Sequence, residues 1–257
     1  MLRTWLHAIT QQMLDACDIR PGARVLDVAA GAGDQTLDIA ARVGPAGGVV
    51  ASDISPRILA LARQKLQRAG FTRVTTQVAD AEALPLAGAE FDAEFDAAVC
   101  RLGLMFCTRP QAALAGLHAA LRPGGRLGVA TFGPRDALWE DLDDVFTPFV
   151  PQGMLDARTS GTRGPFARDA GIEELITNAG FTGARTVRRD QTVRFVDVAQ
   201  WHRWSRSHGQ RMFWEAVPSD QQGAVLAASA DRLEAARDGD GFTLTQQVRY
   251  TMAATPR

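Results

Sequence analysis

The run LDVAAGAGDQT, at Leu26–Thr36, contains residues that could hold a phosphate or a nucleotide-like ligand. Gly31 and Gly33 allow a tight turn and a close approach of the backbone to a ligand, as in the loop that cradles a pyrophosphate. Such a loop has a third glycine for close packing of helix on strand, but position 36 is Thr36. Two glycines alone are a weak signal, and a tight strand-to-helix turn without a ligand is the competing interpretation.

Two further carboxylates stand where a nucleotide-like cofactor would meet them. Asp53 follows Gly31 by 22 residues (53 − 31) near the end of the apolar run GGVVASDI, where it could accept hydrogen bonds from a ribose diol. NAD and S-adenosylmethionine both carry this diol. Asp80 ends the next run, in ADAEALPL, where it could accept from an adenine amino group while the Ala81 N–H faces a ring nitrogen. A turn or helix N-cap is the alternative role for Asp80.

The charges around the glycine loop discriminate between these two cofactors. A pyrophosphate binds at a helix N-terminus because free N–H groups and the helix dipole favour negative charge there. Asp34 places a carboxylate at this position, which opposes a dianion unless the residue only caps the helix. S-adenosylmethionine carries an amino group, a sulfonium and a single carboxylate. A loop flanked by Asp27 and Asp34 therefore suits it better than a dinucleotide.

The elements that position these residues alternate between strand and helix. Apolar, β-branched runs predict buried parallel strands at 23–29, 47–54, 73–80, 96–102 and 126–132, with amphipathic helices between them. This alternation predicts an α/β, doubly wound and mostly parallel sheet whose ligands bind at the carboxyl ends of the strands. The glycine loop, Asp53, Asp80, Cys100 and Arg101 all fall at such ends, so we expect them to converge on one edge.

Segments outside the alternation predict a cover over this edge. Residues 1–19 carry apolar side chains at helical spacing and predict a helix ahead of a cofactor-binding core at 20–132. The stretch 133–167 has no clear period. A helix, a strand, a helical region and a last strand are predicted after it, at 168–178, 184–189, 197–237 and 242–252. We expect 133–257 to complete the sheet and to supply helical lid insertions, within one compact domain.

In order and spacing, the motifs of residues 20–132 resemble those of class I S-adenosylmethionine-dependent methyltransferases. The nearest branch is that of the ubiquinone/menaquinone-biosynthesis C-methyltransferases. The motifs are VLDVAAGAGDQT, VVASDIS, ADAEALPL, FDAAVCRLGLMF and LRPGGRLGVATF. LRPGG, before the fifth strand, has no counterpart in an NAD-binding sheet. The resemblance implies a seven-stranded Rossmann-like sheet whose last strand is antiparallel, and TLTQQVRYTMAA fits that strand.

The resemblance also implies which residues bind S-adenosylmethionine. The glycine loop would contact the methionine part, Asp53 the ribose, and Ile54, Asp80 and Ala81 the adenine. Asp27 would orient the loop or the amino group, and Cys100 would lie under the methionine tail. The implied set is Asp27, Ala29, Gly31, Gly33, Thr36, Asp53, Ile54, Asp80, Ala81, Cys100 and Arg101. Ala29 and Ala30 depart from the commoner glycine-and-cysteine pair.

Methyl transfer from a sulfonium is an in-line displacement with a neutral leaving group. It requires alignment and exclusion of water, and only sometimes a base for the nucleophile. No catalytic side chain has a clear signature in the sequence. The candidates are Arg101 at the mouth of the substrate pocket, and His202 and His208 in the aromatic segment WHRWSRSHGQRMFW. In the alternative interpretation these aromatic residues anchor a cap helix and the histidines are solvated.

Composition narrows the class of partner. A net charge of -1 and a pI near 6.4 give no electrostatic reason to expect a nucleic acid. Three cysteines without CxxC spacing and four scattered histidines predict no metal site, and the chain shows neither a signal peptide nor a membrane-spanning run. We therefore expect a cytoplasmic enzyme acting on a small organic acceptor. An NAD-dependent oxidoreductase or a catalytically silent methyltransferase-fold binding protein are the alternatives; the acceptor atom and oligomeric state stay open.

Overall fold

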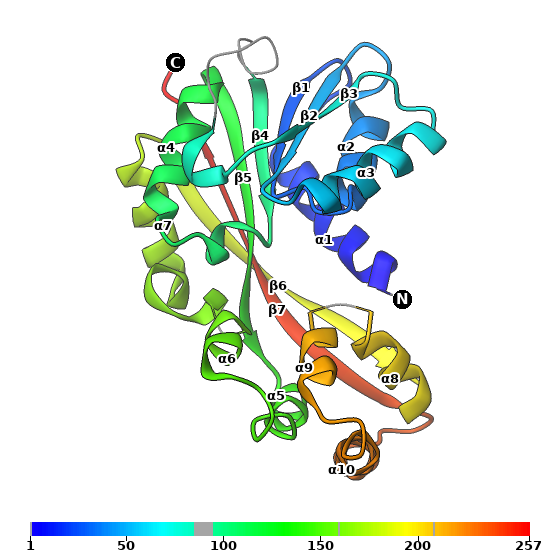
Figure 1. Ribbon diagram of the computed structural model, residues 1–257. Coiled ribbons are helices and arrows are strands. Elements are labelled where there is room, and N and C mark those ends of the chain that lie inside the picture. The colour runs from blue at the N-terminus through cyan, green and yellow to red at the C-terminus, as the bar shows by residue number, and fades with distance from the viewer. Residues whose placement is uncertain (1, 85–94, 159, 208) are drawn as a thin grey trace.

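A computed structural model describes residues 2–84, 95–158, 160–207 and 209–257. Its centre is one seven-stranded sheet in the order β3-β2-β1-β4-β5-β7-β6 (Figure 1). The strands are β1 (Arg24–Val28), β2 (Gly48–Asp53), β3 (Val74–Val78), β4 (Phe95–Arg101), β5 (Leu121–Arg135), β6 (Thr182–Phe195) and β7 (Phe242–Ala254). Strands β1 to β5 are parallel, whereas β7 runs antiparallel to both β5 and β6. The predicted fold class and the antiparallel last strand are confirmed.

Helices cover both faces of the sheet. The longer ones are α1 (Leu2–Ala16), α2 (Asp34–Val43), α3 (Pro56–Arg68), α4 (Pro110–Ala120), α5 (Ala137–Asp144), α6 (Gln152–Arg158), α7 (Asp169–Asn178), α8 (Val198–Ser205), α9 (Arg211–Ala216) and α10 (Gln222–Ala235). The 3-10 turns are η1 (Ala81–Ala83), η2 (Leu104–Phe106), η3 (Ser160–Thr162) and η4 (Gly164–Ala167). Apolar side chains of α1 and α2 form one core against the sheet, and those of α4 and α7 form a second. Ser55 caps α3 by accepting a hydrogen bond from the Ile58 N–H, and Pro56 begins the helix.

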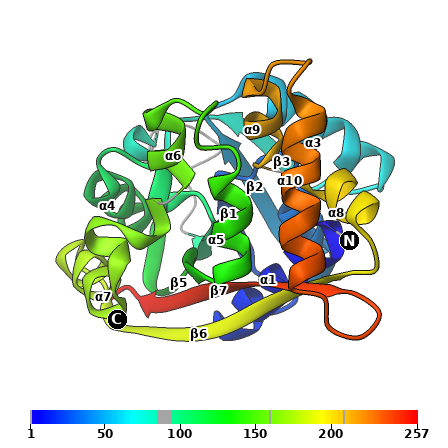
Figure 2. The same ribbon diagram turned by 90° about the horizontal axis from the view of Figure 1, so that it is seen from below.

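A third apolar core lies beyond the end of β5. Strand β5 pairs with β7 as far as Gln246, and β6 alone continues beside β7 to Phe242. This two-stranded extension carries α5, α8, α9 and α10, with α5 and α10 on the same side of it (Figure 2). Large aromatic side chains, including Trp201 and Trp214, fill the space between them. We call these helices, with the extension of β6 and β7, the cap.

The region 133–167 is more ordered than its sequence indicates. Asp136 caps α5 by accepting a hydrogen bond from the Trp139 N–H at 2.8 Å, and the buried side chains of Trp139 and Leu142 belong to the apolar core of the cap. Helices α5 and α6 are 8 and 7 residues long, so neither repeats its apolar face often enough to show a period. Strand β6 also extends past the predicted 184–189 because β7 pairs with it throughout.

Neither a membrane-spanning helix nor a metal-ligand cluster is found among the described residues. No helix among them is both long and apolar enough to cross a membrane. Nor does this part of the chain bring together three or more histidine, cysteine, aspartate or glutamate side chains in an arrangement that could hold a metal ion.

Candidate functional site

The glycine loop after β1 is held by Asp53, the last residue of β2. One carboxylate oxygen, Oδ2, accepts a hydrogen bond from the Gly31 N–H, and Oδ1 accepts one from the Ser55 N–H, both at 2.9 Å. Next to this carboxylate the side chain of Ile54 is 68% exposed. A fixed carboxylate beside an exposed apolar side chain offers both a hydrogen-bond acceptor for hydroxyl groups and a surface for a flat ring.

Three residues of the loop adopt left-handed backbone conformations. The φ angles are 57° at Ala29, 57° at Gly31 and 81° at Gly33. At Gly33 a Cβ atom would lie 2.9 Å from Cβ of Ala62 on α3, so glycine is required for packing. A Cβ at Gly103 would lie only 2.5 Å from Cβ of Ala29. The loops after β1 and β4 therefore meet closely, and Gly103 makes room for the methyl group of Ala29.

A buried carboxylate organises the loop from the inside. Asp27 is fully buried and accepts hydrogen bonds from Gln35 Nε2 at 2.5 Å and from Thr36 Oγ1 at 2.6 Å. Burial raises the pKa of Asp27 to about 6, although the hydrogen bonds from Thr36 and Gln35 and the charge of Arg101 all lower it. Thr36 is buried too. The side chains of Asp27 and Thr36 thus hold the start of α2 in place, and neither of them faces solvent.

Arg101 anchors the N-terminal helix over the carboxyl end of β4. Its Nη1 donates to the Leu6 carbonyl at 3.1 Å and to Thr10 Oγ1 at 2.6 Å. Burial lowers the pKa of Arg101, and the nearby carboxylates of Asp27, Asp34 and Asp38 oppose that shift. The guanidinium is therefore engaged with α1, and it compensates part of the negative charge under the glycine loop.

The other residues predicted at this edge differ in burial and in hydrogen bonding. Asp80 Oδ1 accepts from the Glu82 N–H at 2.9 Å and caps η1, which is the turn role considered from the sequence. Asp80 is exposed and Ala81 is half-buried. Cys100 is buried, and burial raises the pKa of its thiol to about 12, so it stays protonated at neutral pH. Asp53, Asp80, Cys100 and the glycine loop lie at the carboxyl ends of four strands, β2, β3, β4 and β1.

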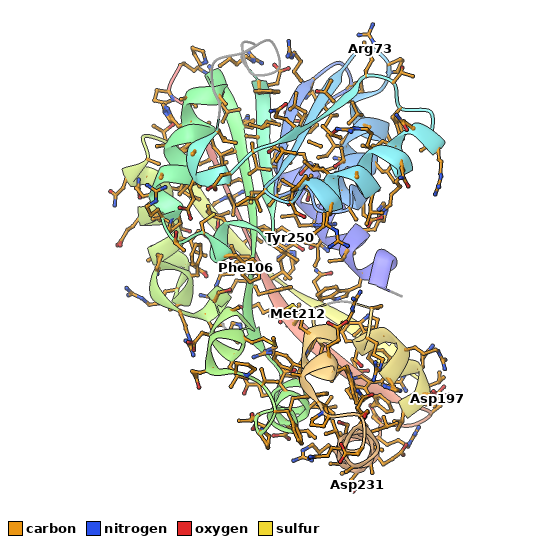
Figure 3. The ribbon with its side chains drawn as sticks, viewed as in Figure 1. Arg73, Phe106, Asp197, Met212, Asp231 and Tyr250 are labelled. Carbon is orange, nitrogen blue, oxygen red and sulfur yellow. The ribbon has the colours of Figure 1, made fainter. Side chains whose placement is uncertain are left out.

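An apolar cavity of about 300 Å³ lies between this edge and the cap; we call it the aromatic cavity. Phe106 of η2 and Met212 of α9 reach toward it from opposite sides (Figure 3). Ring pairs build its walls, including Trp5 with Phe132 at 6.1 Å and Trp139 with Trp204 at 5.5 Å between centroids. The lining residues are Trp5, Leu6, Met105, Phe106, Phe132, Trp139, Met154, Ala157, Trp204, Gly209, Met212, Phe213 and Gln246.

Of the two histidine candidates, the structure describes His202, which is not placed as a base at this cavity. His202 is not among the residues that line it, and its Nε2 accepts a hydrogen bond from Arg206 Nε at 2.9 Å. Burial and the charges of Arg206 and Arg203 lower the pKa of His202. Its ring packs on Trp214, with centroids 4.6 Å apart. His208 lies outside the described residues.

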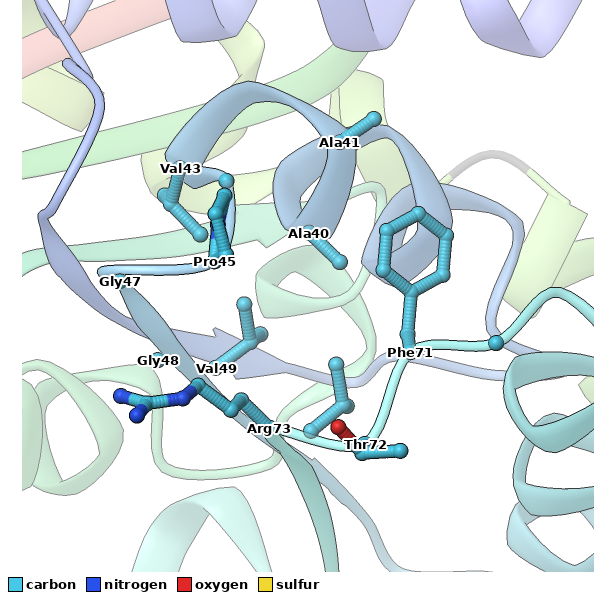
Figure 4. A pocket seen from close by; sticks show the side chains of 13 residues that line it. Ala40, Ala41, Val43, Pro45, Gly47, Gly48, Val49, Phe71, Thr72 and Arg73 are labelled. Carbon is cyan, nitrogen blue, oxygen red and sulfur yellow. The ribbon is translucent and has the colours of Figure 1, made fainter.

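A second pocket, of about 380 Å³, lies at the opposite edge of the sheet (Figure 4). It is lined mainly by small and apolar side chains around Gly48 and Val74, where β2 and β3 begin. Asp53 ends β2, about 16 Å away at 3.3 Å per residue. None of the residues predicted to bind a ligand lines this pocket.

Known proteins similar to this chain include several methyltransferases. A family model described as a methyltransferase domain matches residues 25–125. Nocamycin O-methyltransferase of Saccharothrix syringae is 29% identical over 258 residues, covering 96% of this chain and 90% of that protein. A ubiquinone/menaquinone biosynthesis C-methyltransferase of Teredinibacter turnerae is 39% identical over 136 residues, covering 52% of this chain and 53% of that protein.

Solved structures show the same fold at low sequence identity. The YcgJ protein of Bacillus subtilis aligns with a TM-score of 0.62 and 16% identity, over 98% of this chain and 99% of that one. A Haemonchus contortus phosphoethanolamine N-methyltransferase, solved with S-adenosylhomocysteine, aligns with a TM-score of 0.59 and 16% identity, over 97% of this chain and 53% of that one. At these identities the alignments show a shared fold, which agrees with the match to the methyltransferase domain model.

The packing role of Gly33 can be tested against Gly31. We expect Gly33→Ala to lower the free energy of unfolding by about 2–4 kcal/mol, because strain at positive φ is added to a clash with Ala62. Gly31→Ala is the matched control. Its φ is also positive, but no atom lies within 4 Å of the added Cβ, so its free energy of unfolding should fall by only about 1 kcal/mol. Urea unfolding of both variants measures the difference. Equal losses would contradict the packing role.

Burial of Asp27 predicts a pH dependence of stability. A folded-state pKa raised from 3.8 to about 6 means that the folded chain binds the proton more tightly than the unfolded chain. Stability from this group is present below the unfolded pKa and is lost as pH rises through the folded pKa. Relative to Asp27→Asn, the native chain should lose about 2–3 kcal/mol of unfolding free energy between about pH 4 and pH 7.

Urea unfolding at several pH values measures this loss. Asp190→Asn, which replaces a carboxylate at an exposed position on β6, is the control. If Asp27→Asn also runs parallel to the native chain, the carboxyl group of Asp27 titrates as it would in water.

Proposed function

The chain belongs to the class I S-adenosylmethionine-dependent methyltransferases, in a branch related to the ubiquinone/menaquinone-biosynthesis C-methyltransferases, and we propose that it methylates a small organic acceptor by in-line transfer. The observation that carries this proposal is the closeness of two sites. The glycine loop and the loop after β4 meet at Ala29 and Gly103, and η2, which follows directly, supplies Met105 and Phe106 to the aromatic cavity.

The residues at the strand ends fit the cofactor. The Asp53 carboxylate is held in place by two N–H groups, so it needs no rearrangement to accept hydrogen bonds from ribose hydroxyls. Ile54 offers an exposed apolar surface to adenine, and Asp80 and Ala81 stand at the end of the neighbouring strand. No atom lies within 4 Å of a Cβ built at Gly31, so this part of the loop is open to a ligand.

When bound, S-adenosylmethionine supplies a methyl group on a positively charged sulfur. Because the leaving group is a neutral thioether, the chain has no need to donate a proton to it. What the chain supplies is alignment: aromatic walls hold the acceptor, while α1, fixed by Arg101, covers the edge and excludes water. Cys100 stays protonated and His202 accepts a hydrogen bond from Arg206, so neither is available as a nucleophile or base in this arrangement.

An NAD-dependent oxidoreductase is not favoured by these features. Asp34 at the N-terminus of α2 forms an ion pair with Lys65 at 2.9 Å, so a carboxylate stands where a pyrophosphate would need positive potential. The family match also covers the glycine loop itself.

Asp53 provides the test of the cofactor site. Asp53→Ala should weaken the binding of S-adenosylhomocysteine by about 1.5–3 kcal/mol, the scale of hydrogen bonds to a charged group. Calorimetry measures the affinity, and circular dichroism checks that the fold is intact. Asp190→Ala, which removes the same charge from the exposed face of β6, should bind as the native chain does. Unchanged affinity in Asp53→Ala, or micromolar binding of NAD without binding of S-adenosylhomocysteine, would refute the proposal.

A further inference from the structure

The second pocket, between α2 and the segment that leads into β3, has apolar walls and one charged side chain; we call it the Arg73 pocket. Val43 of α2 and Val49 of β2 supply buried apolar surface to it, and Phe71 supplies a half-buried ring. Figure 4 shows this ring and the guanidinium of Arg73 on opposite sides of Val49. The lining residues make their hydrogen bonds, ion pairs and ring contacts with described residues only, so the polarity of the walls follows from that part of the chain.

The polar groups of the Arg73 pocket come from one short turn, residues 72–73, and all of them can donate a hydrogen bond. The guanidinium of Arg73 is exposed and forms no ion pair or hydrogen bond with another described residue. The backbone N–H groups of Thr72 and Arg73 donate to no described carbonyl group. Within the described lining, Arg73 is also the only charged residue. A cation beside free N–H groups attracts an anion and repels a second cation.

The end of α2, which also lines the Arg73 pocket, does not oppose an anion strongly. The Ala40 carbonyl accepts a hydrogen bond from the Gly44 N–H at 3.1 Å, and the Val43 carbonyl accepts one from the Gly22 N–H at 2.7 Å. These bonds satisfy two of the carbonyl groups that carry the negative end of the helix dipole. The donors of residues 72–73 therefore dominate the polarity of the pocket.

A larger cleft at the same end of the sheet, of about 520 Å³, holds three arginines but suits an anion less well. In that cleft Arg20 donates to Asp18 at 2.7 and 3.0 Å, and Arg122 donates to Asp96 at 2.6 Å. Both carboxylates line the cleft and would repel a second anion. The described lining of the Arg73 pocket contains no acidic side chain, so its single guanidinium is available.

We propose that the Arg73 pocket binds a small monocarboxylic acid with a compact apolar body. The carboxylate pairs with the planar guanidinium of Arg73, which suits two parallel hydrogen bonds, and the apolar body covers Val49 and Phe71. A volume of about 380 Å³ is within the range of roughly 300–1,000 Å³ that is typical of small-molecule sites. A phosphate dianion fits less well, because one guanidinium balances one charge and the second would lie against apolar walls.

This site is separate from the cofactor edge. The Arg73 pocket lies where β2 and β3 begin, whereas Asp53 ends β2. A ligand in the pocket therefore leaves the glycine loop and the ribose-binding carboxylate free, and its binding does not require that the chain transfers methyl groups.

Three small probes separate the charged part of the ligand from its apolar part. Titrations of the 15N-labelled native chain, with and without S-adenosylhomocysteine, measure the affinities of phenylacetate, of the neutral phenylacetamide and of acetate. We expect phenylacetate to bind about fivefold more tightly than phenylacetamide at low ionic strength, and less than about twofold more tightly in about 0.5 M salt, because the paired charges are exposed. Acetate lacks the ring and should bind at least about tenfold more weakly than phenylacetate. The amide resonances of Gly47, Thr72 and Arg73 should shift with phenylacetate.

One substitution locates the charge preference. Arg73→Gln should bring the affinity for phenylacetate down to that for phenylacetamide, about a fivefold loss, and leave phenylacetamide binding unchanged. Arg73 is exposed, so the variant should keep the native amide spectrum. The matched control is Arg68→Gln, which removes the same charge from an exposed position at the end of α3 that does not line the pocket. This control should keep the fivefold preference.

Four results would overturn the inference. They are equal affinities of the native chain for phenylacetate and phenylacetamide, binding of acetate or inorganic phosphate as tight as that of phenylacetate, an unchanged preference in Arg73→Gln, and shifts centred on the glycine loop or the aromatic cavity instead of residues 72–73. Binding of S-adenosylhomocysteine reports on the cofactor edge alone, so failure of either site leaves the other proposal standing.

Discussion

The buried carboxylate of Asp27 is the interaction on which the rest of the site depends. It lies inside the sheet on β1, between β2 and β4, and two hydrogen bonds tie it to the first turn of α2. Such a charge is stable in the interior only when hydrogen bonds and a nearby cation compensate it. Arg101 provides the cation, and its guanidinium also holds α1. One electrostatic constraint therefore links the glycine loop to the helix that covers it.

Helix α1 also connects the glycine loop to the aromatic cavity, because its residues Trp5 and Leu6 line that cavity. Trp5 contacts the core that α1 and α2 form with the sheet, and it also contacts the core of the cap. Its ring lies 6.1 Å from Phe132 on β5 and 6.3 Å from Trp139 on α5, between centroids. The same helix thus covers the carboxyl end of β4 and forms a wall of the aromatic cavity. A change in the position of α1 would alter both sites together.

The sequence predicts that the strand-end residues share one edge of the sheet, and the structure brings them together there for a topological reason. Asp53, Asp80 and Arg101 lie far apart in the chain, but parallel strands end at one edge, so their positions follow once the strands are identified. Contacts between loops could not be found in this way. Gly103 meets Ala29 across two loops, and nothing in the spacing of the two residues indicates it. The partner of His202 is Arg206, one helical turn away, and this spacing alone does not show whether the pair is buried or exposed to solvent.

The sequence by itself determined the fold and the cofactor, because both depend on local patterns: alternating strands and helices, and short motifs at strand ends. Only the tertiary structure decided the shape and polarity of the aromatic cavity. Its walls come from α1, η2, β5, α5, α6, α8, α9 and β7, so no single stretch of sequence contains the pattern. The cavity depends on where β6 and β7 extend past β5 and on how the cap packs against α1. These are long-range packing relations, which side-chain periodicity along the chain does not encode.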